Sequence, residues 1–418
     1  MYFRTDDAII STIRMKNVLK IIAGLFLVIF AYLLITNLFL AFKLPPSGGD
    51  SYWYHVPIAK NILNGNFLFQ KNIIEIEQWY PGASEGILAL FILFHLPVNL
   101  FNVVGIFIFS IVLYKLGKTY LNNKILSIIF SMSVACSYGI FRLVLSQDID
   151  IWFVMYFLIL VMLFENPKDD NTYFLTTGFF SGMLVGSKYT GPFFFLVFLI
   201  VYFKKYMKQL NLKRITLFLV PFCIFGLFWY VRNLILTGSP VYPQSIVFFK
   251  GIEGWSSIGY MSTQTWMSFL RYPGRMFDAY ISEFMIWPVI FIVVPLFIAY
   301  RKKNNVKFAS WPKFKTLLLL ITLSFIVYLI FPSSDRYSAM VLTMRYIYNV
   351  FVLSVLLVFL IAQYFKKEII IALIALTNVL IIFLPSYHPK ILFIFTPVVF
   401  LIGILISYSN QILKKLAK

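Results

Sequence analysis

Charged residues are scarce in this 418-residue chain. Asp, Glu, Lys and Arg make up 12% of it, whereas hydrophobic residues make up 61%. Soluble domains contain about 45–50% apolar and about 25% charged residues, and they cannot bury a larger apolar share. The composition therefore excludes an ordinary soluble enzyme and favours a protein whose outer surface faces lipid.

Cysteine and histidine are also rare. Cys136 and Cys223 both fall inside predicted helices, so neither a disulfide nor a cysteine-bound metal or redox centre is indicated. No Gly-Lys-Ser/Thr phosphate loop occurs, which argues against an ATP-driven pump. The three histidines match no metal-binding spacing: His55, His95 and His388.

Long apolar runs are abundant, and a helix needs roughly 20 such residues to cross a bilayer. They predict an all-α polytopic membrane protein of about twelve transmembrane helices, forming a single transmembrane domain over residues 1–418 without a soluble domain. The first run, residues 18–42, is too long for a signal peptide and lacks a small-residue cleavage site. The predicted spans are 19–42, 98–117, 125–143, 149–165, 172–187, 190–204, 215–232, 284–300, 316–331, 346–365, 368–384 and 391–409.

The positions of the basic residues predict the orientation of these spans in the membrane. The net charge of +20 would suggest a nucleic-acid partner in a soluble protein, but here Lys and Arg stand between the apolar runs. With the N-terminus inside, 24 of the 36 basic residues fall on the inner side, and every inner loop has at least one. Because cytoplasmic loops are enriched in Lys and Arg, we expect both termini to be cytoplasmic in a cell membrane, inner or plasma, and no nucleic-acid partner.

Two predicted outer loops are long, residues 43–98 and 233–283, and they are rich in Tyr, Trp, Gly and Pro. Long ordered loops tend to be functional. Within the first loop, the apolar run over residues 83–96 is too short to span a bilayer. We expect it to form an interfacial or re-entrant amphipathic helix.

Acidic side chains are few, and ten of the sixteen lie on the predicted outer side. Asp50 follows the first span and could cap a helix over residues 51–63, or act as a general base toward an acceptor group. Asp148 and Asp150 lie at the outer end of the fourth span, where an ionisable group is costly unless it faces water, a partner or a site. Since helical residues at i and i+2 point to different faces, we expect at most one of them to face a site shared with Asp50.

Three isolated cations lie at outer span ends. Lys188 follows a glycine-rich helix end, and a phosphate partner would explain its position. Arg232 and Arg345 could extend toward lipid headgroups, as long basic side chains do. Alternatively, their guanidinium groups suit bidentate phosphate binding.

Together these segments resemble the GT-C class of integral-membrane glycosyltransferases, in the branch of protein O-mannosyltransferases and the lipid A aminoarabinose transferase. The resemblance covers roughly residues 15–365. It rests on Gly49-Asp50-Ser51 with Tyr54-His55-Val56-Pro57, on Asn64-Gly65-Asn66 and Trp79-Tyr80-Pro81, on Asp148-Ile149-Asp150, on Gly186-Ser187-Lys188-Tyr189-Thr190-Gly191-Pro192, on Arg232-Asn233 with Gly238-Ser239-Pro240-Val241-Tyr242-Pro243, and on Arg345-Tyr346.

The resemblance implies a polyprenyl-phosphate sugar as donor and transfer with inversion to a glycan, lipid or protein acceptor. It implies Asp50 as the base and Asp148 or Asp150 as a second site acid. It also implies donor-phosphate contacts from Lys188 and Arg345, with Arg232 a weaker candidate. Tyr54, His55 and Tyr346 are expected to line the site. Some relatives use a divalent metal, but no metal ligand set stands out here. Classical mannosyltransferases have Asp-Glu where this chain has Asp50-Ser51, which leaves the sugar and the acceptor open.

Two other interpretations of the sequence also involve a lipid-linked sugar. One is a transporter or flippase, which often shows internal repeats and helices broken at the midplane. No repeat is found, and the charges gather at one face, which favours an enzyme. The other is an O-antigen polymerase or ligase, which usually places its arginines in a different outer loop.

Overall fold

The computed structural model describes residues 4–46, 48–66, 79–207, 209, 211–245, 248–252, 263–304, 308, 310–333 and 336–383. Within these residues the chain is an all-α polytopic membrane protein. The predicted final span, residues 391–409, lies outside the described part of the chain.

Apolar helices form the bulk of the molecule. The N-terminal half contains α1 (Arg4–Lys43), α2 (Val56–Leu63), α3 (Ala83–Leu93), α4 (Leu100–Leu121), α5 (Lys124–Ala135), α6 (Tyr138–Phe141), α7 (Asp150–Glu165), α8 (Asn171–Ser187) and α9 (Gly191–Met207). The C-terminal half contains α10 (Leu212–Phe222), α11 (Phe228–Thr237), α12 (Thr265–Arg271), α13 (Pro273–Phe284), α14 (Ile290–Lys303), α15 (Trp311–Ile330), α16 (Tyr337–Thr343), α17 (Tyr348–Tyr364) and α18 (Glu368–Leu380).

Short turns and strands complete the description. Single helical turns occur at η1 (Ser51–His55), η4 (Cys223–Leu227), η6 (Trp287–Val289), η7 (Met344–Ile347) and η8 (Ile381–Phe383). Two two-residue strands, β1 (Thr263–Gln264) and β2 (Pro332–Ser333), pair antiparallel.

Each predicted span up to residue 384 coincides with a helix or a helix with adjoining turns. By length and apolarity, five helices in the described residues can cross a membrane, or six if the bent pair of α13 and the η6–α14 segment counts as one span. Helices α7, α8 and α9 have 16 or 17 residues each, slightly under the length of a full span. The predicted span over residues 284–300 corresponds to the η6–α14 segment, and the bend of 117° lies just before this segment, between Phe284 and Trp287.

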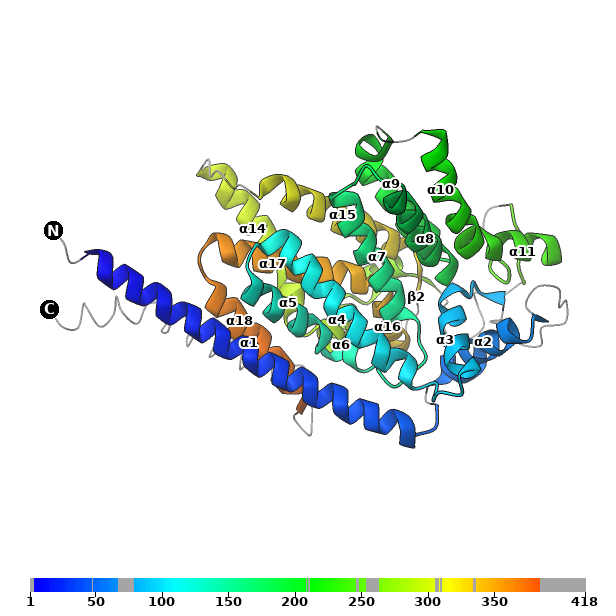
Figure 1. Cartoon of the computed structure of the whole chain (residues 1–418), viewed down its shortest axis with the longest axis horizontal. Helices are drawn as coiled ribbons and strands as arrows, with labels where there is room; N and C mark the ends of the chain where they lie inside the picture. The colour runs from blue at the N-terminus through cyan, green and yellow to red at the C-terminus, as the bar shows by residue number, and fades with distance from the viewer. Residues whose placement is uncertain are drawn as a thin grey trace.

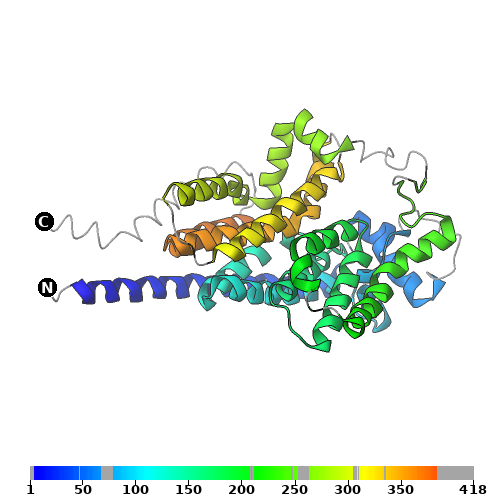
Figure 2. The same ribbon diagram turned by 90° about the horizontal axis from the view of Figure 1, so that it is seen from above.

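The helices form one bundle with α1 along one edge (Figure 1). The N-terminal part of α1 extends beyond the rest of the bundle as a straight rod (Figure 2). At the other end of the bundle lie the helices of the first outer loop, α2 and α3, which confirm the expected amphipathic helices there. The predicted helix over residues 51–63 is present, with η1 as a π-helical first turn.

Close packing of α8 against α10 and η4 fixes the position of Lys188. A Cβ atom at Gly178 would lie 2.2 Å from the carbonyl oxygen of Phe218, and one at Gly186 would lie 1.9 Å from that of Phe225. Only glycine permits this approach of the two backbones. Because Lys188 directly follows α8, this packing sets where its side chain begins.

Candidate functional site

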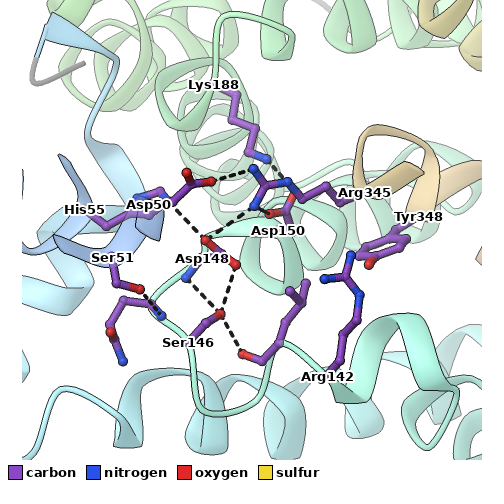
Figure 3. A network of polar contacts seen from close by, with 12 residues as sticks. Asp50, Ser51, His55, Arg142, Ser146, Asp148, Asp150, Lys188, Arg345 and Tyr348 are labelled. Carbon is purple, nitrogen blue, oxygen red and sulfur yellow. Dashed lines mark hydrogen bonds and ion pairs between the residues drawn. The ribbon is translucent and has the colours of Figure 1, made fainter. Parts of the chain in front are cut away.

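Arg345 joins three carboxylates that come from two distant parts of the sequence (Figure 3). Its Nη2 lies 2.5 Å from Oδ2 of Asp50, and its Nη1 lies 3.4 Å from Oδ1 of Asp148 and 3.8 Å from Oδ2 of Asp150. We call Asp50, Asp148 and Asp150 the acid cluster. They come from the turn after α1, the segment before α7 and the first residue of α7, all at predicted outer span ends.

Asp50 does not cap the following helix through its side chain. Its carboxylate instead accepts a hydrogen bond from Arg345. Burial raises the pKa of Asp50, but the charge and hydrogen bond of Arg345, with His55 and Lys188 nearby, outweigh it, so the pKa lies below its usual value. Asp50 is therefore held as a carboxylate, able to accept a proton or a hydrogen bond.

Both acids of the Asp148–Asp150 pair reach Arg345, contrary to the expectation that at most one would face the site. The expectation assumed a helix through both residues, but α7 begins at Asp150 and Asp148 precedes it. Ser146 Oγ donates to Oδ2 of Asp148 at 3.0 Å, and Asn102 Nδ2 donates to the Asp148 carbonyl oxygen at 2.7 Å. These bonds turn the Asp148 carboxylate toward Arg345.

Lys188 pairs with Asp150. Its ammonium group also lies over the rings of Tyr346 and Phe153, at 5.4 and 5.8 Å from their centroids. Two cations, Lys188 and Arg345, thus share the acid cluster. Tyr346 lines the same place, as expected from the sequence.

His55 extends the cluster in a way that the sequence did not reveal. Its Nδ1 lies 2.7 Å from Oε1 of Glu85, and its Nε2 lies 3.8 Å from Oδ1 of Asp148. His55 and Glu85 are 2% and 1% exposed, so the pair is fully buried. Glu85 was the missed residue, and its one signal was an acid inside the apolar run of α3, where an ionisable group needs a partner.

Aromatic rings flank the acid cluster on the first-loop side. The Tyr54 ring lies 4.1 Å from that of His55 and 5.5 Å from that of Tyr80, and Tyr80 in turn contacts Tyr189. Burial raises the pKa of Tyr54, so its hydroxyl stays protonated and can donate a hydrogen bond. Such rings suit the apolar faces of a sugar.

Arg232 stands apart from this group. Its Nη2 donates to the carbonyl oxygen of Trp79 at 3.0 Å, and its guanidinium lies over the rings of Trp79 and Trp229. Among the described residues it forms no ion pair with an acidic side chain. The structure thus places Arg232 beside the first-loop segment at Trp79, while Lys188 and Arg345 meet the acid cluster.

Three side chains could hold a divalent cation. Asp50, His55 and Asp148 each offer one ligand atom, and these atoms lie within 4.8 Å of one another. Carboxylate oxygens and imidazole nitrogen suit a transition metal, and Glu85 would orient the imidazole from behind. Arg345 already neutralises both carboxylates, so a bound cation would compete with its guanidinium.

An apolar pocket is lined in part by residues that follow Arg345 closely in the sequence. It is small and is formed where α13 and α14 bend, against the start of α17. Its lining includes Phe284, Trp287, Ile347 and Phe351. Ile347 follows Arg345 by two residues, so the pocket adjoins the segment that carries the central guanidinium.

Comparison with known proteins gives one family match and one structural match. Residues 87–256 match a family described as a domain of unknown function (DUF8201). No curated protein matches the chain. The crystal structure of ArnT from Cupriavidus metallidurans bound to undecaprenyl phosphate is similar over 94% of this chain and 73% of that chain, with a TM-score of 0.55 and 12% sequence identity. The likeness shows that this multi-pass membrane protein has a GT-C-like fold.

Proposed function

We propose that this chain is a glycosyltransferase that moves a sugar from a polyprenyl-phosphate donor to an acceptor at the outer membrane face. The observation that carries the proposal is the Asp50 carboxylate paired with Arg345, in a partly buried cluster that also contains Lys188. Such a site combines a base with cations for a phosphate leaving group. The acceptor supplies a hydroxyl, or an amine or phosphate in its place.

The reaction follows from these charges. The acceptor oxygen attacks the anomeric carbon from the side opposite the phosphate, so the configuration inverts. The bond between the anomeric carbon and the phosphate oxygen breaks, and its electron pair stays on the phosphate. Asp50 takes the proton of the acceptor hydroxyl. Arg345 and Lys188 stabilise the charge that the phosphate gains.

The cations must change partners for this to happen. In the structure Arg345 and Lys188 bind the acid cluster. A bound phosphate would take over some of their N–H groups, which frees the carboxylates to meet the acceptor. Asp148 and Asp150 then hold Arg345 in position, and a divalent cation at Asp50, His55 and Asp148 would add positive charge to the same place.

A lipid donor fits the position of the site. The acid cluster is formed at span ends, where it can meet the phosphate of a lipid whose prenyl chain lies in the bilayer, and the pocket between the α13–α14 bend and α17 adds an apolar surface beside the segment of Arg345. The structurally similar ArnT is bound to undecaprenyl phosphate, which supports a donor of the same class. We assign the site to the non-cytoplasmic side, because the positive-inside pattern places both termini in the cytoplasm.

The test uses the purified full chain in liposomes with a panel of polyprenyl-phosphate sugars and candidate acceptors. We expect at least one donor to release polyprenyl phosphate in an acceptor-dependent reaction, with a product of inverted anomeric configuration. Movement of the lipid across the liposome membrane without release from any donor would instead indicate a flippase. Transfer of preassembled glycan from a lipid diphosphate alone would indicate a polymerase or ligase.

A further inference from the structure

A second arginine lies beside the acid cluster and has no role in the reaction above. Arg142 directly follows α6, on the segment that leads to Asp148. Its guanidinium points toward Tyr348, and Figure 3 shows both residues beside the polar network around Arg345. Arg142 was overlooked in the sequence, although it too stands at the outer end of a predicted span, over residues 125–143.

The Glu283 carboxylate binds two nitrogen atoms of the Arg142 guanidinium group, an arrangement that we call the fork. Arg142 Nε lies 3.2 Å from both carboxylate oxygens of Glu283, and Nη2 lies 2.9 Å from Oε1. The Tyr348 hydroxyl contacts the same carboxylate and the carbonyl oxygen of Gly139. A Cβ atom at residue 139 would lie 2.8 Å from Glu283 Oε1, so only glycine lets the carboxylate reach this depth. The fork fixes the plane of the guanidinium.

A structural ion pair does not account for the whole arrangement. Glu283 is completely buried, but the Arg142 side chain is 24% exposed. Among the described residues, Nη1 of Arg142 has no hydrogen-bond partner. Arg345 also acts electrostatically on Arg142, so both guanidinium groups contribute positive charge to the same region of the site.

Tyr348 connects this arginine to the apolar pocket. Its hydroxyl meets Glu283, and its ring packs against Phe284 at 5.9 Å between centroids. Phe284 lines the pocket. A lipid whose prenyl chain lies against this apolar surface would therefore bring its phosphate to the side of Tyr348 where Arg142 lies.

We propose that Arg142, held by Glu283 and Tyr348, binds the phosphate of the lipid donor with its free Nη1 edge, opposite Arg345. This inference rests on the proposed function. It separates the two charged parts of the site, with Asp50 serving the acceptor and Arg142 retaining the lipid phosphate before and after transfer. Arg142 is then a binding residue, and Glu283 and Tyr348 are its positioning residues.

The test measures the binding of polyprenyl phosphate and of the uncharged polyprenol to the purified full chain. The ratio of the two affinities reports the phosphate contact, because structural damage weakens both lipids alike. We expect Arg142→Gln to lower this ratio at least tenfold, since a charge-assisted bond contributes about that factor. The matched control is Arg271→Gln, the same change at an exposed arginine of α12, and it should leave the ratio unchanged.

The outcomes distinguish this inference from the proposed function. If Arg142→Gln lowers the ratio less than threefold, Arg142 does not bind the phosphate. If that variant does not fold, the double variant Arg142→Gln with Glu283→Gln removes both charges of the pair, and the same threefold limit applies to it. If wild-type protein shows no preference for polyprenyl phosphate over polyprenol, the proposed function itself fails.

Discussion

Single residues in this site are explained by the charges around them. Asp50 could have served as a helix cap, yet its carboxylate binds Arg345 instead. Isolated Lys188 and Arg345 were recognisable in the sequence because cations at outer span ends need a partner. Glu85 was overlooked although an acid inside an apolar run needs a partner, because that partner, His55, lies 30 residues away and only the fold brings them together.

The lowered pKa of Asp50 predicts the acid limb of the pH–activity profile. A base must be ionised, so activity is lost as pH falls through the folded-state pKa, which lies below the usual value of about 4. In Arg345→Gln the raising effect of burial remains without its main opposing charge. We expect the acid limb of kcat/KM to move to higher pH. An acid limb at the same pH in both proteins would contradict this assignment of charge.

Loss of Glu85 should weaken folding. Glu85→Ala leaves the buried His55 Nδ1 without its partner, which costs about 1–3 kcal/mol of unfolding free energy. Asp169→Ala is the control, because Asp169 is exposed and its pair with Arg214 contributes about 1 kcal/mol or less. Reversible unfolding of the detergent-solubilised protein measures both. Equal losses of unfolding free energy in the two variants would show that the buried His55–Glu85 pair stabilises the fold no more than an exposed ion pair does.

At the level of elements, the residue at which a helix begins or ends determines which side chains face the site. The i, i+2 argument for Asp148 and Asp150 failed because α7 starts between them, and helix boundaries are the least reliable part of a sequence prediction. The predicted span over residues 284–300 corresponds to the single η6–α14 segment, but hydropathy gave no sign of the sharp bend that joins it to α13. The apolar pocket forms at this bend.

The close packing of α8 against η4 predicts a contrast between Gly186 in α8 and Gly86 in α3. Gly186→Ala would force the two helices apart, since a Cβ there meets the Phe225 carbonyl oxygen, and we expect a loss of about 1–3 kcal/mol. Gly86→Ala in α3 meets nothing within 4 Å and should stabilise by about 0.5–1 kcal/mol. Thermal unfolding of both variants tests this. Similar behaviour of the two would mean that the packing at Gly186 is looser than described.

For the whole molecule, hydropathy predicted where the helices lie in the sequence but not which helix ends meet in space. The spans up to residue 384 follow from apolar length alone. Which span ends meet does not, because Asp50 and Arg345 are 295 residues apart and no local pattern encodes that contact. The alternation of inner and outer span ends reduced the number of possible contacts between them. It placed every residue of the acid cluster on the same predicted side of the membrane.

The orientation of the bundle gives a prediction of its own. In a background with Cys136→Ala and Cys223→Ser, we expect Tyr52→Cys to react with a membrane-impermeant maleimide added outside intact cells. Lys204→Cys should react only after the membrane is opened. Both positions are exposed in the structure, so burial does not bias the comparison. The reverse labelling pattern would place the acid cluster on the cytoplasmic side.

The most direct test of the account compares wild type with Asp50→Asn in liposomes that contain the polyprenyl-phosphate sugar found to be active. The amide keeps the shape of the side chain but cannot take a proton. We expect acceptor-dependent release of polyprenyl phosphate to fall about 10²–10⁴-fold, with the affinity for polyprenyl phosphate kept within a few-fold of wild type. Equal release by both proteins would contradict the central claim that Asp50 is the base of a lipid-phosphate glycosyltransferase.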